Sequence, residues 1–376
     1  MKKIKVCFVA TYAWALFAEQ LGYPERTPFG GSEIQLYQLA KELVRDESFE
    51  VSFVVGDFGQ KNLLYINGIK VYKGFKPPGY IISHLSQQAI RPPLRLGRIL
   101  HRVSADIYIQ RAATWVTGII ALFCKLFHKK FVYMVAHHID VSGEYAEKNG
   151  LRGRAFDWGL KKADLVITQN KEQINLLAER YHKRICLIKT IYPVENISPV
   201  EKDSILWVGR GETWKQPKLF IQLAQQFPQE RFIMICQPAV YYGAVFEQIK
   251  KQAQKISNLS FIEYVPFGEI DQYFRKAKVL VNTSDYEGFP NTFIQATKNK
   301  TPLLSFKVNP NNLINRYQCG FCAEGNFAKM VDQLKELLNN KLAWEQSSKN
   351  GFIYAREHHN LSKLMPEFKW LLNSLV

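Results

Sequence analysis

The sequence predicts an α/β protein made of two doubly wound, parallel-sheet domains. The chain has 376 residues, more than one ordinary hydrophobic core accommodates. Short runs of β-branched and aromatic residues alternate with segments of helical periodicity, a pattern typical of parallel sheets that are covered on both faces. The segment TIYPVENISPVEKDS, at 190–204, has two prolines and no periodicity, and it is the expected linker between the domains.

The first domain is expected over 1–192 and the second over 193–359, with a C-terminal helix at about 360–376 that can pack back on the first. Amphipathic helices are expected at 32–45 and 217–227. The first apolar run imitates a signal peptide, but the Gly-rich loop and helix that follow require a strand there. The expected strands are 4–10, 51–55, 107–110, 131–136, 165–168, 186–191, 205–208, 232–236, 259–262, 279–282 and 303–305.

The formal net charge is +17, and the N-terminal half is the more basic one. In RPPLRLGRILHRV, at 91–103, four arginines recur at helical spacing with apolar residues between them. This helix either binds an anionic membrane surface or is an ordinary solvated face. We find no nucleic-acid-binding motif, so nucleic acid is not an expected partner. The longest apolar run, 115–124, is too short for a membrane span, which takes about 20 residues.

The six cysteines are scattered and are expected to be free thiols in a reducing cytosol. Cys319 and Cys322 form one C-x-x-C pair, but no second Cys or His pair completes a structural zinc site. No D-x-D motif is present, and we expect no metal ion in the site. The sequence therefore favours a cytoplasmic protein, with peripheral attachment to the cytoplasmic membrane face as the open question raised by 91–103.

Two N-terminal loops carry candidate binding residues, since ligands of open α/β sheets bind at the carboxyl ends of the strands. In TPFGGSEIQ, Gly30 and Gly31 allow close backbone approach or positive φ. Ser32 and Gln35 predict a capping box there, and such a helix N-terminus favours an anion. In AHHID, at 136–140, a histidine can orient a hydroxyl or act as a base, and the alternative is an ordinary loop histidine.

Two C-terminal loops are more specific. In ILWVGRGETWKQP, Arg210 follows a strand and Lys215 lies just before a helix, a suitable pair of cations for a pyrophosphate. In NTSDYEGFPNTFIQ, Glu287 lies at a Gly-Pro corner, where it can accept hydrogen bonds from sugar hydroxyls. Thr292 and Gln295 then predict a second capping box.

These residues resemble the retaining glycosyltransferases of family 4, which have the two-domain GT-B architecture. The resemblance covers most of the chain and is strongest over LWVGRGETWKQP and NTSDYEGFPNTFIQATKNKTPLL. The family pattern is Glu, seven residues, Glu; Glu287 matches the first Glu, and Gln295 replaces the second. GT-B architecture implies that the two domains face a central cleft.

The resemblance implies a role for each matching position. Arg210 and Lys215 would hold the donor diphosphate and neutralise the leaving group, and Glu287 would bind hydroxyls of the donor sugar. His137, with His138 as the alternate, would lie near the reactive carbon. Gln295 would either contact the ribose or only cap its helix. The remaining donor-binding positions implied are Gly30, Gly31, Gly288, Phe289, Pro290, Asn291 and Thr292.

The resemblance thus implies transfer of a sugar from a nucleoside-diphosphate donor, UDP- or GDP-linked, to a glycan or lipid-linked acceptor. Surface polysaccharide or glycolipid biosynthesis is the expected setting, and no other cofactor is expected. Because Gln295 departs from the family pattern, a non-catalytic nucleotide-sugar-binding or polysaccharide-binding partner of a biosynthetic complex remains the alternative. A Rossmann dehydrogenase is excluded because no G-x-G-x-x-G follows the first strand.

Overall fold

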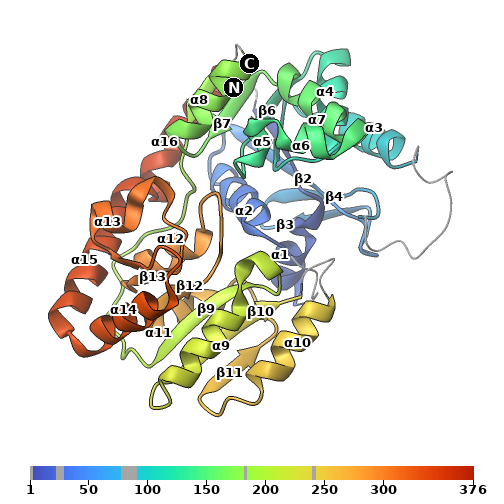
Figure 1. Ribbon diagram of the computed structural model, residues 1–376. Helices are drawn as coiled ribbons and strands as arrows, with labels where there is room; N and C mark the ends of the chain where they lie inside the picture. The colour runs from blue at the N-terminus through green and yellow to red at the C-terminus, as the bar shows by residue number, and fades with distance from the viewer. Residues whose placement is uncertain (1–2, 23–28, 78–90, 182–183, 239–242) are drawn as a thin grey trace. The chain divides into compact units, whose positions relative to one another are not determined.

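The computed structural model describes residues 3–22, 29–77, 91–181, 184–238 and 243–376 (Figure 1). The chain divides into two compact units. Unit 1 contains Met1–Ile191 together with Leu361–Val376, and unit 2 contains Tyr192–Asn360. Each unit has a parallel α/β sheet with helices on both faces, so the prediction of two doubly wound sheets is confirmed.

The sheet of unit 1 has eight strands in the order β3-β4-β2-β1-β5-β6-β7-β8. All neighbouring pairs are parallel except the β3–β4 hairpin. The order reverses between β1 and β5. The strands are β1 (Ile4–Val9), β2 (Phe49–Val55), β3 (Leu63–Ile66), β4 (Ile69–Lys73), β5 (Ile107–Arg111), β6 (Lys130–Met134), β7 (Leu165–Thr168) and β8 (Ile185–Leu187).

Successive residues of the unit 1 strands point to opposite faces of the sheet, and both faces are apolar. Cys7, Tyr108 and Tyr133 share a core with α3, α4, α7 and α8, whereas Phe8 and Phe53 pack towards α1. The helices of unit 1 are α1 (Trp14–Ala18), α2 (Gly31–Leu43), α3 (Arg91–Val103), α4 (Val116–Leu126), α5 (Ile139–Ser142), α6 (Glu144–Lys148), α7 (Gly150–Lys162), α8 (Lys171–Arg180) and α16 (Leu361–Asn373).

The sheet of unit 2 is all parallel, in the order β11-β10-β9-β12-β13-β14. Helices α9, α10 and α14 pack on one face, and α11, α12, α13 and α15 on the other. The strands are β9 (Ser204–Arg210), β10 (Phe232–Gln237), β11 (Leu259–Ile262), β12 (Ala277–Asn282), β13 (Leu303–Ser305) and β14 (Gly320–Cys322). The helices are α9 (Pro217–Gln226), α10 (Gly243–Ala253), α11 (Ile270–Lys276), α12 (Asn291–Lys298), α13 (Leu313–Tyr317), α14 (Phe327–Asn339) and α15 (Lys341–His358).

Three strands were not predicted. β3 and β4 form a hairpin whose turn residues, Asn67 and Gly68, both have positive φ. Asn-Gly between apolar runs is a strong hairpin signal, so this turn was readable from YINGIK. β14 has only three residues, and its Gly320 has a φ of 146°, which disfavours every other residue.

The predicted basic helix is present as α3, but the apolar residues expected to interleave with its arginines do not face solvent, although Leu94 is 59% exposed. Leu96, Ile99, Leu100 and Val103 are buried in the core of unit 1. The helix therefore offers no apolar face of its own to a bilayer. Among the described residues, no helix combines the length and the apolarity that a membrane span requires.

The last segment of the chain packs on unit 1. Its helix α16 contacts α2, and Lys369 forms a salt bridge of 2.7 Å with Asp46 near the end of α2. The Ser374 hydroxyl accepts a hydrogen bond of 2.8 Å from Arg184. The chain therefore passes from unit 1 to unit 2 after Ile191 and returns after Asn360.

Candidate functional site

In unit 2, the strand order reverses between β9 and β12, which are neighbours in the sheet. Ligands of open α/β sheets bind at such a switch point, outside the carboxyl ends of the strands. Arg210 is the last residue of β9, and Glu287 lies in the loop after β12. The topology therefore brings both loops to the same edge of the sheet.

One oxygen of Glu287 is held by three donors. Its Oε1 lies 2.8 Å from Lys215 Nζ, 2.9 Å from Asn282 Nδ2 and 2.7 Å from the Ser284 hydroxyl. The Lys215 and Glu287 side chains are only 15% and 12% exposed. Within the described residues, Oε2 has no protein partner, so this oxygen can accept a hydrogen bond from a ligand.

The environment of Glu287 favours its ionised form. Burial is the largest single influence and opposes ionisation, but the Lys215 ammonium and the hydrogen bonds from Lys215, Ser284 and Asn282 together outweigh it. The pKa of Glu287 is therefore lowered from its ordinary value. At neutral pH this residue is a fixed hydrogen-bond acceptor.

Lys215 is positioned by its backbone and by an aromatic pair. Its carbonyl accepts a 2.6 Å hydrogen bond from Thr283, the residue that follows β12. Its ammonium lies 4.4 Å from the ring centre of Trp214, which stacks on Tyr286 at 5.2 Å. The loops after β9 and β12 therefore hold each other directly.

Arg210 takes a different partner from Lys215. Its guanidinium lies 3.2 Å from Oε1 of Glu212, a residue that is almost completely buried. The other carboxylate oxygen of Glu212 is buried and makes no hydrogen bond to any residue that the structure describes. The guanidinium is itself 39% exposed, so it has free N–H groups for a second anion.

The Gly-Pro corner leads into α12, which starts at Asn291 with Pro290 as its N-cap. The predicted capping box of Thr292 and Gln295 is wrong, because Thr292 lies inside the helix and, among the described residues, no side chain caps the helix start. The first backbone N–H groups of α12 are therefore not occupied by a side-chain cap, and they can bind an anion.

Gln295 lies inside α12 and is 5% exposed. Its carbonyl accepts a bond from Asn299, whereas its side-chain amide has no hydrogen-bond partner among the described residues. Because the helix-capping role is excluded, ribose contact is the remaining interpretation of this residue. It stays a prediction.

In unit 1, the helix after Gly30 and Gly31 is present as α2, but its cap differs from the prediction. The capping box of Ser32 and Gln35 is wrong. The Glu33 carboxylate accepts a bond of 2.9 Å from the Gly30 amide, and Gln35 is buried, where it pairs with the backbone of Ile191. Gly30 has a φ of −127°, so this position does not require glycine for a positive φ.

The histidine loop after β6 is held by a buried carboxylate, Asp140. One oxygen of Asp140 accepts hydrogen bonds from the Tyr133 hydroxyl, the Ala136 amide and the His137 amide, at 3.0, 2.7 and 3.3 Å. Burial raises the pKa of Asp140, although His137 and these hydrogen bonds oppose that rise. The side chains of His137 and His138 are both exposed, and His138 lies 3.4 Å from Glu172.

Two family models match the chain, one for each half. "Glycosyltransferase Family 4" matches residues 29–194, and "Glycosyl transferases group 1" matches residues 189–355. The chain is also 25% identical over 256 residues to the amylovoran biosynthesis glycosyltransferase AmsD of Erwinia amylovora, covering 61% of this chain and 69% of that protein. The chain belongs to the group 1 glycosyltransferases.

Solved structures show that this glycosyltransferase has the GT-B fold. Sucrose-phosphate synthase from Thermosynechococcus elongatus matches with a TM-score of 0.78 and 14% identity, over 99% of each chain. Anabaena HepE, solved in complex with UDP-glucose, matches with a TM-score of 0.74 and 15% identity, over 99% of this chain and 100% of that one. At these identities the likeness concerns the fold alone.

Sequence reasoning missed several residues that support the glycosyltransferase site. Asn282 and Ser284 flank Thr283 in the strand-end segment NTS, and Glu212 lies between Arg210 and Lys215. Asp140 lies within AHHID, where only the histidines were considered. The available signal was a polar side chain at or shortly after the end of a buried strand.

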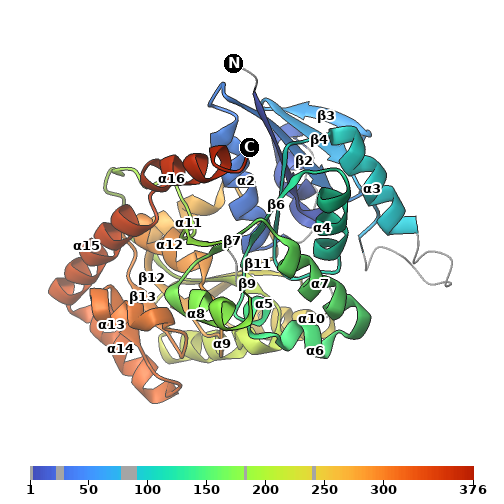
Figure 2. The ribbon, with the colours of Figure 1, turned by 90° about the horizontal axis from the view of Figure 1, so that it is seen from above.

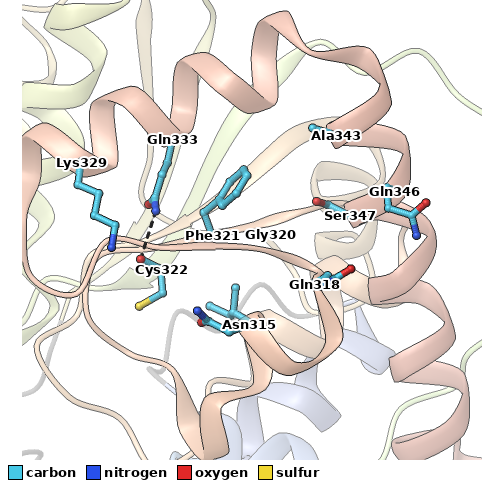
Figure 3. Close-up of a pocket in the computed structure, with 11 residues that line it drawn as sticks. Asn315, Gln318, Gly320, Phe321, Cys322, Lys329, Gln333, Ala343, Gln346 and Ser347 are labelled. Atoms are coloured by element: carbon cyan, nitrogen blue, oxygen red, sulfur yellow. Dashed lines mark hydrogen bonds between the residues drawn. The ribbon is translucent and has the colours of Figure 1, made fainter.

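A separate pocket of about 380 Å³ lies along the edge strand β14 and includes none of the predicted donor-site residues (Figure 3). Phe321, Gln333 and Lys329 line it, and Gln333 donates a 3.3 Å hydrogen bond to the Cys322 carbonyl. The predicted donor-site residues Arg210, Lys215 and Glu287 lie instead at the β9/β12 switch point.

Proposed function

We propose that this glycosyltransferase moves a sugar from a nucleoside-diphosphate donor, with retention of configuration and without a metal ion. The observation that supports this function most directly is the Lys215–Glu287 pair at the β9/β12 switch point. It places a cation and a hydroxyl acceptor side by side in one buried setting. A sugar diphosphate needs both, because its phosphates are anionic and its sugar is a polyol.

The two cations have a direct chemical use. When the bond between the anomeric carbon and the diphosphate oxygen breaks, negative charge develops on the leaving nucleoside diphosphate. Lys215 and Arg210, with the N-terminus of α12, are the groups proposed to stabilise it. Both cations are already fixed by carboxylates, Glu287 and Glu212, so less side-chain freedom is lost when the donor binds.

The remaining predicted residues are assigned to the sugar and the nucleotide. The open Oε2 of Glu287 would accept hydrogen bonds from sugar hydroxyls, and the backbone of Gly288–Asn291 with Thr292 would contact sugar and phosphate. Gln295 would contact the ribose through its amide. In unit 1, His137 is proposed for the reactive carbon, and Gly30 and Gly31 for the diphosphate.

The proposed donor is a UDP-sugar, with a GDP-sugar as the alternative, and the proposed acceptor is a glycan or a lipid-linked glycan. Two comparisons support this choice. HepE was solved with UDP-glucose, and AmsD is described as an amylovoran biosynthesis glycosyltransferase. We therefore place the reaction in the biosynthesis of a surface polysaccharide, on the cytoplasmic side of the membrane.

Calorimetric titration of the full chain with UDP, GDP, ADP and CMP, each with and without EDTA, tests the donor assignment. We expect one diphosphate to bind selectively and EDTA to leave its affinity unchanged. Lys215→Met and Arg210→Gln should abolish binding, while Lys218→Gln, which changes an exposed lysine of α9, should not. Equal binding by Lys215→Met and wild type would overturn the site assignment, and loss of binding in EDTA would overturn metal independence.

The same titration separates the enzyme from the non-catalytic alternative. Selective donor binding with no hydrolysis or transfer to any glycan or lipid-linked acceptor would favour a binding partner. Gln295→Glu, which restores the family residue, would then be the first variant to assay for turnover.

A further inference from the structure

Helices α3, α4 and α7 of unit 1 lie side by side, with α4 in contact with both of the others (Figures 1 and 2). Gly118 of α4 lies so close to α7 that a Cβ on it would be 2.5 Å from the Ala155 carbonyl oxygen. At the other end of α4, the Phe127 ring lies 5.2 Å from that of His101 in α3. The three helices therefore form one continuous layer.

The outer side of this layer exposes large apolar side chains. Leu126 is 64% exposed and Leu151 is 81% exposed, values that are unusual for leucine in a folded unit. On and next to α4 and α7 the exposed apolar residues are Leu122, Leu126, Phe127, Leu151 and Trp158, and α3 exposes Leu94. Isolated surface leucines need no explanation, but several on neighbouring helices mark an interaction surface.

Basic side chains lie on the same helix faces. On α4, Leu122, Lys125 and Leu126 are three and four positions apart and thus share one face. On α7, Leu151, Arg154, Trp158 and Lys162 follow the same spacing. The exposed cations are Arg98, Arg102, Lys125, Arg154 and Lys162. We call these five cations and the five apolar residues on and next to α4 and α7 the α3–α4–α7 surface.

The charge of this surface is not neutralised. Helices α3 and α4 contain no acidic residue, and the one in α7, Asp157, is paired with Lys161 and Arg180. Within the described part of the chain, none of the five cations forms a salt bridge. The acids next to this surface are also paired: Asp106 with Lys129, and Asp164 with Lys130. In the adjoining α6, Glu144 pairs with Lys148, which leaves Glu147 as the acid of α6 without a salt bridge among the described residues.

We infer that the α3–α4–α7 surface docks on an anionic lipid bilayer, in an orientation that keeps unit 1 outside the hydrocarbon region. Leucine and aromatic side chains enter the interface, Trp158 lies at the headgroup level, and the cations contact lipid phosphates. This replaces the docking helix 91–103 with a surface of three helices, because Leu96, Ile99, Leu100 and Val103 of α3 are in the core. The inference does not depend on the proposed transfer reaction.

The test is co-sedimentation of the full chain with vesicles, either of phosphatidylcholine alone or of phosphatidylcholine with phosphatidylglycerol. We expect binding to the anionic vesicles only, decreasing with salt. The variant Arg98→Gln, Arg102→Gln, Lys125→Gln should bind about 100-fold more weakly, since each cation near an anionic leaflet contributes a factor of about five. Its control is Lys251→Gln, Lys255→Gln, Lys349→Gln, which removes three exposed lysines of unit 2.

The contribution of the apolar residues is tested with the triple variant Leu122→Ser, Leu126→Ser, Leu151→Ser, which should also lose binding to anionic vesicles. Leu63→Ser, Tyr65→Ser, Leu342→Ser removes three other exposed apolar residues and should bind as wild type. Brominated lipids should quench the fluorescence of wild type and not of Trp158→Phe. Light scattering is the second readout: a wild-type dimer that the apolar variant converts to a monomer would identify a protein interface and overturn the inference, as would wild-type binding by either surface variant.

Discussion

The candidate residues of the two units are held in different ways. In unit 2, the side chains of Lys215 and Glu287 bind each other, and both are largely buried. In unit 1, the side chains of His137 and His138 are exposed, and what fixes their loop is a carboxylate, Asp140, that binds backbone amides. Unit 2 thus presents a preorganised charge pair, and unit 1 presents a preorganised loop.

This difference predicts which substitutions change stability as well as transfer and which change transfer alone. Removing one member of a buried pair leaves the other as an uncompensated charge, so stability and chemistry change together. Removing an exposed loop side chain leaves the fold intact and changes chemistry alone. The predictions below test this distinction, from the largest expected effect to the smallest.

The largest effect is expected for Lys215→Met. It should reduce transfer about 10²–10³-fold, as when one transition-state donor is lost, and reduce the free energy of unfolding by about 3–5 kcal/mol, because Glu287 stays buried without its cation. Adding Glu287→Gln should restore part of the stability and none of the transfer. Urea unfolding and a transfer assay check this. Equal stability of Lys215→Met and wild type would contradict the buried-pair description.

In unit 1, Asp140→Ala should reduce the free energy of unfolding by about 1–3 kcal/mol, because the buried Tyr133 hydroxyl and the Ala136 amide lose their acceptor. His137→Ala should leave stability near wild type and reduce transfer. Comparing these two variants distinguishes the role of the Asp140 carboxylate, which supports the loop, from the role of the His137 side chain. If His137→Ala destabilises the protein as much as Asp140→Ala, the loop is not held in the way described.

The two units should also respond oppositely to acid. The pKa of Glu287 is lowered by folding, so its contribution to stability is present above the ordinary value of about 4.3 and is lost as pH falls below it. The pKa of Asp140 is raised, so its contribution is complete below about 3.9 and is lost as pH rises through the folded value.

Unfolding of wild type, Glu287→Gln and Asp140→Asn across acidic pH measures this contrast. The stability advantage of wild type over Glu287→Gln should shrink as pH falls, whereas that of wild type over Asp140→Asn should grow. Slopes of the same sign would show that one of the two environments has been assigned incorrectly.

The smallest effect is expected for His138→Ala. His138 and Glu172 are 50% and 64% exposed, and such surface pairs contribute about 0–1 kcal/mol. Stability and transfer should both stay close to wild type. A loss of transfer comparable with that of His137→Ala would assign the reactive-carbon position to His138 instead.

Sequence reasoning located the strands of both sheets except β3, β4 and β14, because the apolar runs of the other strands are continuous and largely buried. It singled out Arg210, Lys215 and Glu287 because each lies in a short polar motif at or after the end of a strand, and their role in donor binding stays a prediction. It did not find Glu212, Asn282, Ser284 or Asp140, whose roles come from contacts that only the folded loops create. Both predicted capping boxes failed for one reason: each helix starts earlier than expected, with Gly30 and Pro290 as the N-caps, so Ser32 and Thr292 lie inside their helices.

The return of residues 361–376 to unit 1 has a consequence for biosynthesis. The ribosome completes all of unit 2 before it delivers α16, whose Lys369 pairs with Asp46. During synthesis, unit 1 therefore stays incomplete, and the surface that α16 later covers stays exposed, until the whole of unit 2 has been made. A nascent chain stalled near residue 360 would hold a finished unit 2 beside an unfinished unit 1, and this late closure is where we expect chaperones to act.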